Sequence, residues 1–242
     1  ANMSGRMAIV TKSPLTGIWG EATVGGTWGA EFRCTGYDAL VIRGAATSPV
    51  YLWINDDDVE IRPAETLWGQ DTYDANDLLL ADTDPKAKVA AIGQAGENLV
   101  RIAAVMVEGR HARAAGRTGM GAVMVAKKLK AIVVRGTRGV PAYNPAGLMG
   151  WALQKTNDVP PKFGMFTVYG TSGSIEVHEE RGGLPIKNFQ DGHWTNGAAR
   201  ISGKTIHQKY AVKSSSCSGC PIHCWQHVTL EDGNGVRVNV GH

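Results

Sequence analysis

Long apolar runs are missing from this 242-residue chain. No uninterrupted stretch approaches the roughly 20 apolar residues that a membrane-spanning helix needs. The first ten residues, ANMSGRMAIV, also lack the apolar region and the cleavage site of a signal peptide. We therefore expect a cytoplasmic protein without a membrane span.

Charge of one sign is not in excess either. The chain has 25 Lys and Arg residues against 22 Asp and Glu residues, for a formal net charge of +3. The two signs are interspersed along the sequence and form no basic stripe, so nucleic acid is not an expected partner. No nucleophile triad, Walker A loop or true G-x-G-x-x-G motif stands out, and we assign no catalytic residue.

Cysteine is scarce, and its few copies are unevenly placed. Three of the four cysteines, Cys217, Cys220 and Cys224, lie in the run CSGCPIHC with the spacing C-x2-C-x3-C. Clustering of this kind indicates a reducing compartment and a metal rather than disulfides. Three thiolates at this spacing favour an iron–sulfur cluster, which needs a fourth ligand. That ligand is either Cys34 or a residue outside the chain.

Zinc is the competing interpretation of the cysteine run. The three cysteines with His223 or His227 would make a Cys3His set, which is a common structural zinc site. The compact spacing, and Pro221 directly after the second cysteine, favour iron and sulfur over zinc.

Glycine, in contrast, is abundant, with 31 copies. Residues 109–121, GRHARAAGRTGMG, precede a helix that we expect at 122–130. Backbone N–H groups and the positive end of a helix dipole attract an anion, and Arg110, Arg113 and Arg117 could donate to a phosphate. The segment predicts a cofactor that bears phosphate or pyrophosphate. The alternative is a glycine-rich turn with solvated arginines.

A second glycine-rich segment, residues 20–32, follows Arg6. Gly25, Gly26 and Gly29 would let a flat ligand lie against the backbone, although a plain loop between strands is the simpler interpretation. The three acids at 56–58 suggest a calcium loop. The other ligands of such a loop are missing, so we expect a solvated hairpin turn there.

Periodicity predicts the elements in outline. Strands are expected at 6–12, 39–43, 50–55, 59–62, 88–92, 98–107 and 132–135, helices at 72–82, 122–130, 146–156 and 171–181, and a loop with short strands at 18–33. Residues 136–145, GTRGVPAYNP, have the composition of a linker. We therefore predict an α+β fold, in which a β-rich domain over 1–136 precedes the start of a mainly helical domain over 137–242.

Many blocks of the sequence, in order, carry a family resemblance. They are SGRMAIVTKSPLTG (4–17), VGGTWGAEFRCTGYDALVIRG (24–44), PVYLWINDDDVEIR (49–62), LWGQDTYDAND (67–77), AAIGQAGENLVRIAAVM (90–106), RAAGRTGMGAVMVAKKLKAI (113–132), YGTSGSI (169–175), GGLPIKNFQDG (182–192) and CSGCPIHC (217–224). Together they resemble the tungsten-containing aldehyde:ferredoxin oxidoreductase family.

The resemblance implies that the chain is a fragment. Family members begin before SGR and continue well past the cysteine run. By this resemblance the fourth cluster ligand, and the acids and histidine that handle protons, lie beyond His242. Cys34 is then expected to be a core residue and not a cluster ligand.

The family also implies a set of cofactors. The first domain would be a base for two molybdopterins that hold one tungsten or molybdenum, with Mg²⁺ linking their phosphates partly through backbone carbonyls near Thr23 and Ala114. A [4Fe–4S] cluster would be bound by the three clustered cysteines. Motif matching implies Arg6 between pterin and cluster, Thr23, Gly25 and Gly26 under one pterin, and Arg113, Ala114, Gly116 and Arg117 around the pterin phosphates.

This chain departs from the family at two of the matched segments. Thr23 stands where asparagine is common, and Thr118 stands where glycine is common. A contact through the backbone carbonyl of residue 23 would survive the first change. The side chain of Thr118 leaves less space in its loop than glycine would.

The implied activity is oxidation of an aldehyde to a carboxylic acid, with electrons passed to ferredoxin or to an iron–sulfur partner subunit of an oligomer. A related possibility is a tungsten subunit that acts on another acyl substrate, such as a class II benzoyl-coenzyme A reductase. A structural zinc-binding module is the alternative from a different class.

Overall fold

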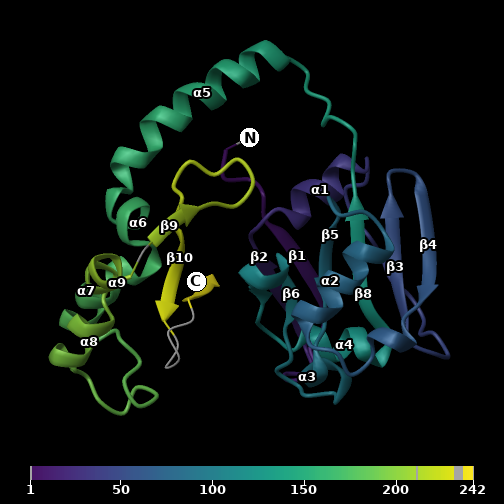
Figure 1. Cartoon of the computed structure of the whole chain (residues 1–242), viewed down its shortest axis with the longest axis horizontal. Helices are drawn as coiled ribbons and strands as arrows, with labels where there is room; N and C mark the ends of the chain where they lie inside the picture. The colour runs from purple at the N-terminus through teal and green to yellow at the C-terminus, as the bar shows by residue number, and fades with distance from the viewer. Residues whose placement is uncertain (1, 211, 232–236, 242) are drawn as a thin grey trace. The chain divides into compact units, whose positions relative to one another are not determined.

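The computed structural model describes residues 2–210, 212–231 and 237–241. The chain divides into two compact units, shown in Figure 1. One unit is Gly5–Pro145, and the other comprises Ala146–His242 together with Ala1–Ser4. We describe each unit by itself.

The first unit is rich in strands. Its elements are β1 (Met7–Lys12), β2 (Trp19–Val24), α1 (Trp28–Cys34), β3 (Val50–Asn55), β4 (Asp58–Pro63), η1 (Glu65–Leu67), α2 (Thr72–Asp82), β5 (Lys88–Ala91), α3 (Gln94–Glu97), β6 (Val105–Val107), η2 (Gly109–His111), β7 (Arg113–Ala115), α4 (Met120–Ala126) and β8 (Leu129–Arg135). β1 and β2 form an antiparallel pair, and the other strands form a six-stranded sheet of order β4-β3-β8-β5-β6-β7. In that sheet β3 and β8 pair in parallel, and the other neighbouring strands pair antiparallel.

The sheet separates two hydrophobic clusters. Along β3, Leu52 and Ile54 belong to one cluster, while Tyr51 and Trp53 belong to the other. Successive side chains of a strand point to opposite faces, so this alternation places a core on each side of the sheet.

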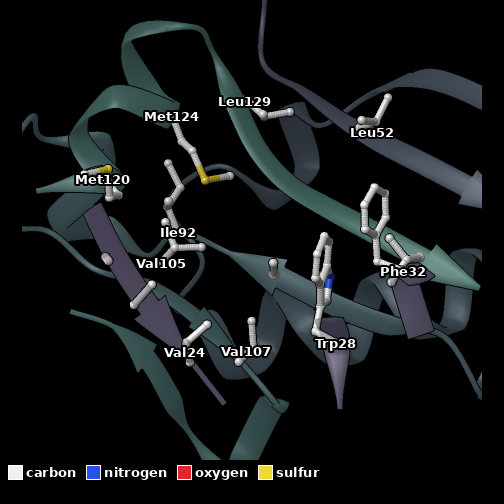
Figure 2. Packing of buried hydrophobic residues seen from close by; sticks show 14 of the residues in the cluster. Val24, Trp28, Phe32, Leu52, Ile92, Val105, Val107, Met120, Met124 and Leu129 are labelled. Carbon is white, nitrogen blue, oxygen red and sulfur yellow. The ribbon is translucent and has the colours of Figure 1, made fainter. Parts of the chain in front are cut away.

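Helix α1 and helix α4 contribute to the first of these clusters. Trp28 and Phe32 of α1 stack with their ring centroids 5.3 Å apart, and Met120 and Met124 come from α4. Figure 2 shows these side chains converging on the same core. Because this core also includes Val24 of β2, it fixes the strand hairpin and the loops that follow it against the sheet.

The second unit is mainly helical in its first part. Its elements are α5 (Pro145–Lys162), α6 (Gly164–Tyr169), η3 (Thr171–Ser174), α7 (Ile175–Glu180), α8 (Thr195–Ile201), α9 (Gly203–Lys209), β9 (Val212–Ser215), β10 (Trp225–Glu231) and β11 (Arg237–Gly241). The three strands form an antiparallel sheet of order β11-β10-β9. In the part of the chain that the structure describes, no helix is both long and apolar enough for a membrane crossing.

The predicted fold class is confirmed: the chain is a mixed α+β protein with a β-rich first part and helices after it. The helix predicted at 72–82 is α2. Of the acids at 56–58, Asp56 and Asp57 form the hairpin turn between β3 and β4, and Asp58 is the first residue of β4.

Two local predictions are wrong, and a third is only partly confirmed. Residues 39–43 form no strand, and Val41 is 75% exposed. Of 98–107 only Val105–Val107 is a strand. The segment 18–33 contains a complete strand and most of helix α1, where short strands and a loop were expected.

Candidate functional site

The strand hairpin brings the first two predicted site residues together. In the antiparallel pair, Met7 lies opposite Val24, so Arg6 reaches the end of β2. The Arg6 guanidinium donates to Thr23 Oγ1 at 3.0 Å and to the Thr23 carbonyl oxygen at 3.4 Å. These hydrogen bonds are exposed, at the point where the chain enters Gly25 and Gly26.

The second predicted segment lies beside the first. Strand β7, which carries Arg113 and Ala114, packs next to β2. After β7 the chain continues through Gly116 and Arg117, and Ser13 Oγ donates to the Thr118 carbonyl oxygen at 2.8 Å. The first unit contains all of the following predicted site residues: Arg6, Thr23, Gly25, Gly26, Arg113, Ala114, Gly116 and Arg117.

At one position of the loop before α4, only glycine fits the backbone. Thr118 and Gly119 both have positive φ, 62° and 75°. A Cβ atom at Gly119 would lie 2.0 Å from the carbonyl oxygen of Arg101, so any other residue would clash with the backbone. Thr118 adopts the left-handed conformation without that freedom.

The three arginines of this loop are not equivalent. Arg110 Nη2 lies 2.8 Å from Asp77 and 3.6 Å from Asp74, both on α2. The hydrogen bond with Asp77 raises the pKa of Arg110 above its usual value. Arg117 is exposed, and it makes no ion pair with any residue that the structure describes. Arg110 is therefore already paired with acids of α2, which makes it a weaker candidate for a phosphate than Arg117.

Glu108 is a residue of this region that the sequence did not single out. It has a left-handed φ of 70°. Its carboxylate accepts hydrogen bonds from the Thr27 amide at 2.6 Å, the Thr27 hydroxyl at 2.9 Å and the Trp28 amide at 3.2 Å. The contact joins positions about eighty residues apart, so no local pattern could have revealed it.

The cysteine run lies in the second unit, between β9 and β10. The Cys220 amide donates to the Cys217 carbonyl oxygen at 3.0 Å, and Gly219 has a φ of 63°. His223 also has a positive φ, 54°, so the backbone turns twice within the run. Cys217, Cys220 and Cys224 are all half-buried, and no disulfide joins any of the four cysteines, which are all described.

The zinc alternative would use a histidine of the same region. His227 Nε2 lies 2.6 Å from Ser215 Oγ, and its ring stacks on Trp225. Among the described residues, no three His, Cys, Asp or Glu side chains are grouped closely enough to hold a single metal ion. Cys34 belongs to the other unit, at the last position of α1.

The donor sets fit the two kinds of cofactor in their chemistry. An exposed arginine beside a glycine-shaped backbone suits a phosphate group. Three half-buried thiols in successive turns are the ligand type that iron–sulfur clusters use, each thiolate binding one iron.

Comparison with known families identifies close counterparts for both units. The sequence model described as "Aldehyde ferredoxin oxidoreductase, N-terminal domain" matches residues 1–136. The model described as "Aldehyde ferredoxin oxidoreductase, domains 2 & 3" matches residues 149–239.

Individual relatives agree with these matches. The tungsten-containing aldehyde ferredoxin oxidoreductase of Pyrococcus furiosus is 42% identical over 228 residues, which are 93% of this chain and 37% of that protein. The Thermococcus kodakarensis protein of the same name is 41% identical over the same length. An aliphatic sulfonate oxidoreductase, WOR-like subunit, from Pyrococcus furiosus is 32% identical over 236 residues, 90% of this chain and 37% of that protein. The chain thus spans little more than a third of the length of these relatives.

A solved structure has the same fold. It is titled as the active site complex BamBC of benzoyl coenzyme A reductase in complex with 1,5-dienoyl-CoA. The match has a TM-score of 0.77 and 29% identity, and it covers 100% of this chain and 38% of that chain.

Proposed function

Because the chain belongs to the aldehyde ferredoxin oxidoreductase family, we propose that it is part of a tungsten-dependent oxidoreductase that converts aldehydes to carboxylic acids. The reaction takes an aldehyde and water to a carboxylic acid, two protons and two electrons. A tungsten centre held by two pterins supplies the two-electron chemistry, while the protein supplies binding and electrostatics. The observation that carries the proposal is the 42% identity over 93% of the chain.

The pterin-binding domain would span residues 1–136, most of which lie in the first unit. Arg117 and Arg113 would neutralise pterin phosphates, and the exposed backbone at Gly25, Gly26 and Gly116 would let a flat ligand approach closely. Arg6 would hold Thr23, whose carbonyl, with that of Ala114, would face a phosphate-bound Mg²⁺.

The start of the helical domain would span residues 137–242, most of which lie in the second unit. Its Cys217, Cys220 and Cys224 would bind three irons of a [4Fe–4S] cluster. That cluster would pass electrons to ferredoxin or to an iron–sulfur partner subunit of an oligomer.

The test is elemental analysis with low-temperature EPR on the full-length protein, purified without oxygen. We expect tungsten, about four irons per chain, and the signal of a reduced cluster. Zinc in place of iron, without tungsten or pterin, would overturn the proposal and favour the structural zinc module.

A pair of arginine variants tests the site itself. Arg117→Ala removes an exposed cation that has no ion pair among the described residues, whereas Arg110→Ala removes one already neutralised by Asp77. We expect the first variant to lower the pterin-to-protein ratio and the second to leave it unchanged. Equal ratios in both variants would remove Arg117 from the proposed site.

Benzoyl coenzyme A is a second candidate substrate, and one structural match favours it. The structural match at a TM-score of 0.77 is to a benzoyl coenzyme A reductase complex. Turnover of small aldehydes measured against reduction of benzoyl coenzyme A separates the two. Activity with benzoyl coenzyme A alone would make the chain the tungsten subunit of such a complex.

A further inference from the structure

Glu108 joins the two segments on which a cofactor would sit. It immediately precedes residues 109–119, and its carboxylate binds Thr27 and Trp28, which immediately follow Gly25 and Gly26. All three donors, two amides and one hydroxyl, lie within 3.2 Å of a carboxylate oxygen. A charged acceptor of this kind makes shorter and stronger hydrogen bonds than a neutral one.

The backbone on the other side of the contact is shaped to admit the Glu108 side chain. Gly26 has a φ of 106°, and a Cβ there would lie 2.5 Å from Glu108 Oε1 and 2.9 Å from its Cγ. The glutamate therefore packs against the backbone of Gly26. Its own left-handed φ of 70° is unusual for a non-glycine residue and turns the chain toward this contact.

The same loop is held at three further points. Arg110 is bound by Asp77 of α2, and the Thr118 carbonyl accepts a hydrogen bond from Ser13, which is 1% exposed. At Gly119 the loop lies directly against the carbonyl of Arg101. Between these anchors lie Arg113 and Arg117. Of the anchors, Glu108 alone contacts the segment that follows Gly25 and Gly26.

We propose that Glu108 is a positioning residue for the cofactor. Its carboxylate sets the distance between the 25–28 segment and the 109–119 loop, so that the glycines and the arginines face one ligand together. Glu108 itself accepts hydrogen bonds within the protein and does not bind the ligand. This inference rests on the proposed function, because it assumes a pterin with a phosphate.

A purely structural role is the alternative, since Glu108 also satisfies amides at the start of α1. Asp71 offers a matched control. Its carboxylate accepts hydrogen bonds from the Tyr73 amide at 2.8 Å and the Asp74 amide at 2.9 Å, and so caps α2 in the same unit. Removal of either carboxylate leaves two backbone amides at the start of a helix without their acceptor, but only Glu108 connects the two segments.

The experiment compares Glu108→Ala, Glu108→Gln and Asp71→Ala in the full-length protein. The first measurement is the pterin-to-protein ratio after anaerobic gel filtration, read as the fluorescence of the oxidised pterin. The second is hydrogen–deuterium exchange at the Thr27 and Trp28 amides in protein freed of cofactor. Neither measurement depends on catalytic activity.

We expect Glu108→Ala to retain roughly tenfold less pterin, in line with the loss from supporting residues around bound metals. The Thr27 and Trp28 amides should lose protection in the same variant. Glu108→Gln keeps one oxygen acceptor and should restore part of both signals. Asp71→Ala should lose comparable thermal stability and keep its pterin.

Two outcomes would overturn the inference while the proposed function stands. One is wild-type pterin content in Glu108→Ala, and the other is an equal loss of pterin in Asp71→Ala. A wild-type protein without pterin would instead refute the proposed function, and the positioning role with it.

Discussion

At the scale of single residues, the contact between Gly26 and Glu108 shows what one missing Cβ allows. The glycine supplies both a positive φ and the space that the glutamate side chain fills. At some other positions a glycine with positive φ supplies the backbone conformation alone. Gly44, for example, has a φ of 71°, and apart from its two chain neighbours no described residue has an atom within 4 Å of where its Cβ would be.

This difference predicts unequal costs for two alanine substitutions. We expect Gly44→Ala to lower the free energy of unfolding by about 1 kcal/mol through backbone strain. Gly26→Ala should cost about 2–3 kcal/mol, because it also displaces Glu108 from the amides of α1. Urea denaturation of both variants measures the difference. Equal losses would mean that the contact with Glu108 contributes little.

A buried ion pair is the other notable contact at this scale. Lys130 of β8 is fully buried and contacts Glu97 of α3, which is 6% exposed. Lys130 Nζ also donates to the Gln70 carbonyl at 2.9 Å, and the Gly69 amide donates to Glu97 at 2.9 Å. The pair therefore connects the sheet, α3 and the segment before α2.

Breaking this pair should be costly. We expect Lys130→Met to lower the free energy of unfolding by about 3–5 kcal/mol, since Glu97 is left buried without a counter-charge. Adding Glu97→Leu should recover part of the loss, because no uncompensated charge then remains. Chemical denaturation of the single and double variants measures both the loss of unfolding free energy and its recovery. A double variant less stable than Lys130→Met would contradict this account.

At the scale of elements, the hairpin of β3 and β4 holds the chain that leaves the sheet. Asp56, in the turn, accepts hydrogen bonds from the Thr137 hydroxyl at 2.5 Å and from the Thr137 amide at 2.9 Å. These donors, the hydroxyl first, lower the pKa of Asp56. The acids that resemble a calcium loop in sequence thus anchor residues after β8.

The lowered pKa predicts how the stability depends on pH. A carboxyl group whose folded pKa lies below its unfolded value of about 3.9 stabilises the fold at higher pH. That contribution is lost as the pH falls through the lowered folded pKa. We expect the stability difference between the wild type and Asp56→Asn to be largest above about pH 5 and to shrink below about pH 4. Denaturation curves across this range measure it, and a pH-independent difference would contradict the prediction.

At the scale of the whole molecule, the segment of chain that connects the two units is largely exposed. Residues 139–141 and 143–145 are exposed, and Tyr143 is fully so. Exposed connections with few backbone hydrogen bonds are the preferred sites of proteolysis.

Limited proteolysis tests the accessibility of this connection. With low amounts of chymotrypsin, we expect the first cut in the 242-residue chain to follow Tyr143. Mass spectrometry of the early fragments identifies the site. Trp28 and Trp53 are buried, so a first cut at either one would contradict the described fold.

The sequence by itself determined the features that depend on neighbouring residues. Helix α2 could be predicted because its helix-favouring residues lie within one short segment, whereas its cap, Asp71, lies one residue before the predicted helix. The cysteine spacing and the ordered blocks of the family are likewise local, so the amino-acid pattern was enough to indicate the fold class and the family. The 1–136 and 137–242 boundaries, and the roles of individual site residues, remain predictions.

Only the tertiary structure decided features that depend on distant partners. Helix α1 is capped by Glu108, about eighty residues away, and Arg110 differs from Arg117 because the acids of α2 neutralise it. Residues 39–43 have the composition of a strand but gain no pairing partner among the described residues. Pairing, capping and charge neutralisation require contacts that the fold alone brings together, and a sequence pattern records only its own neighbours.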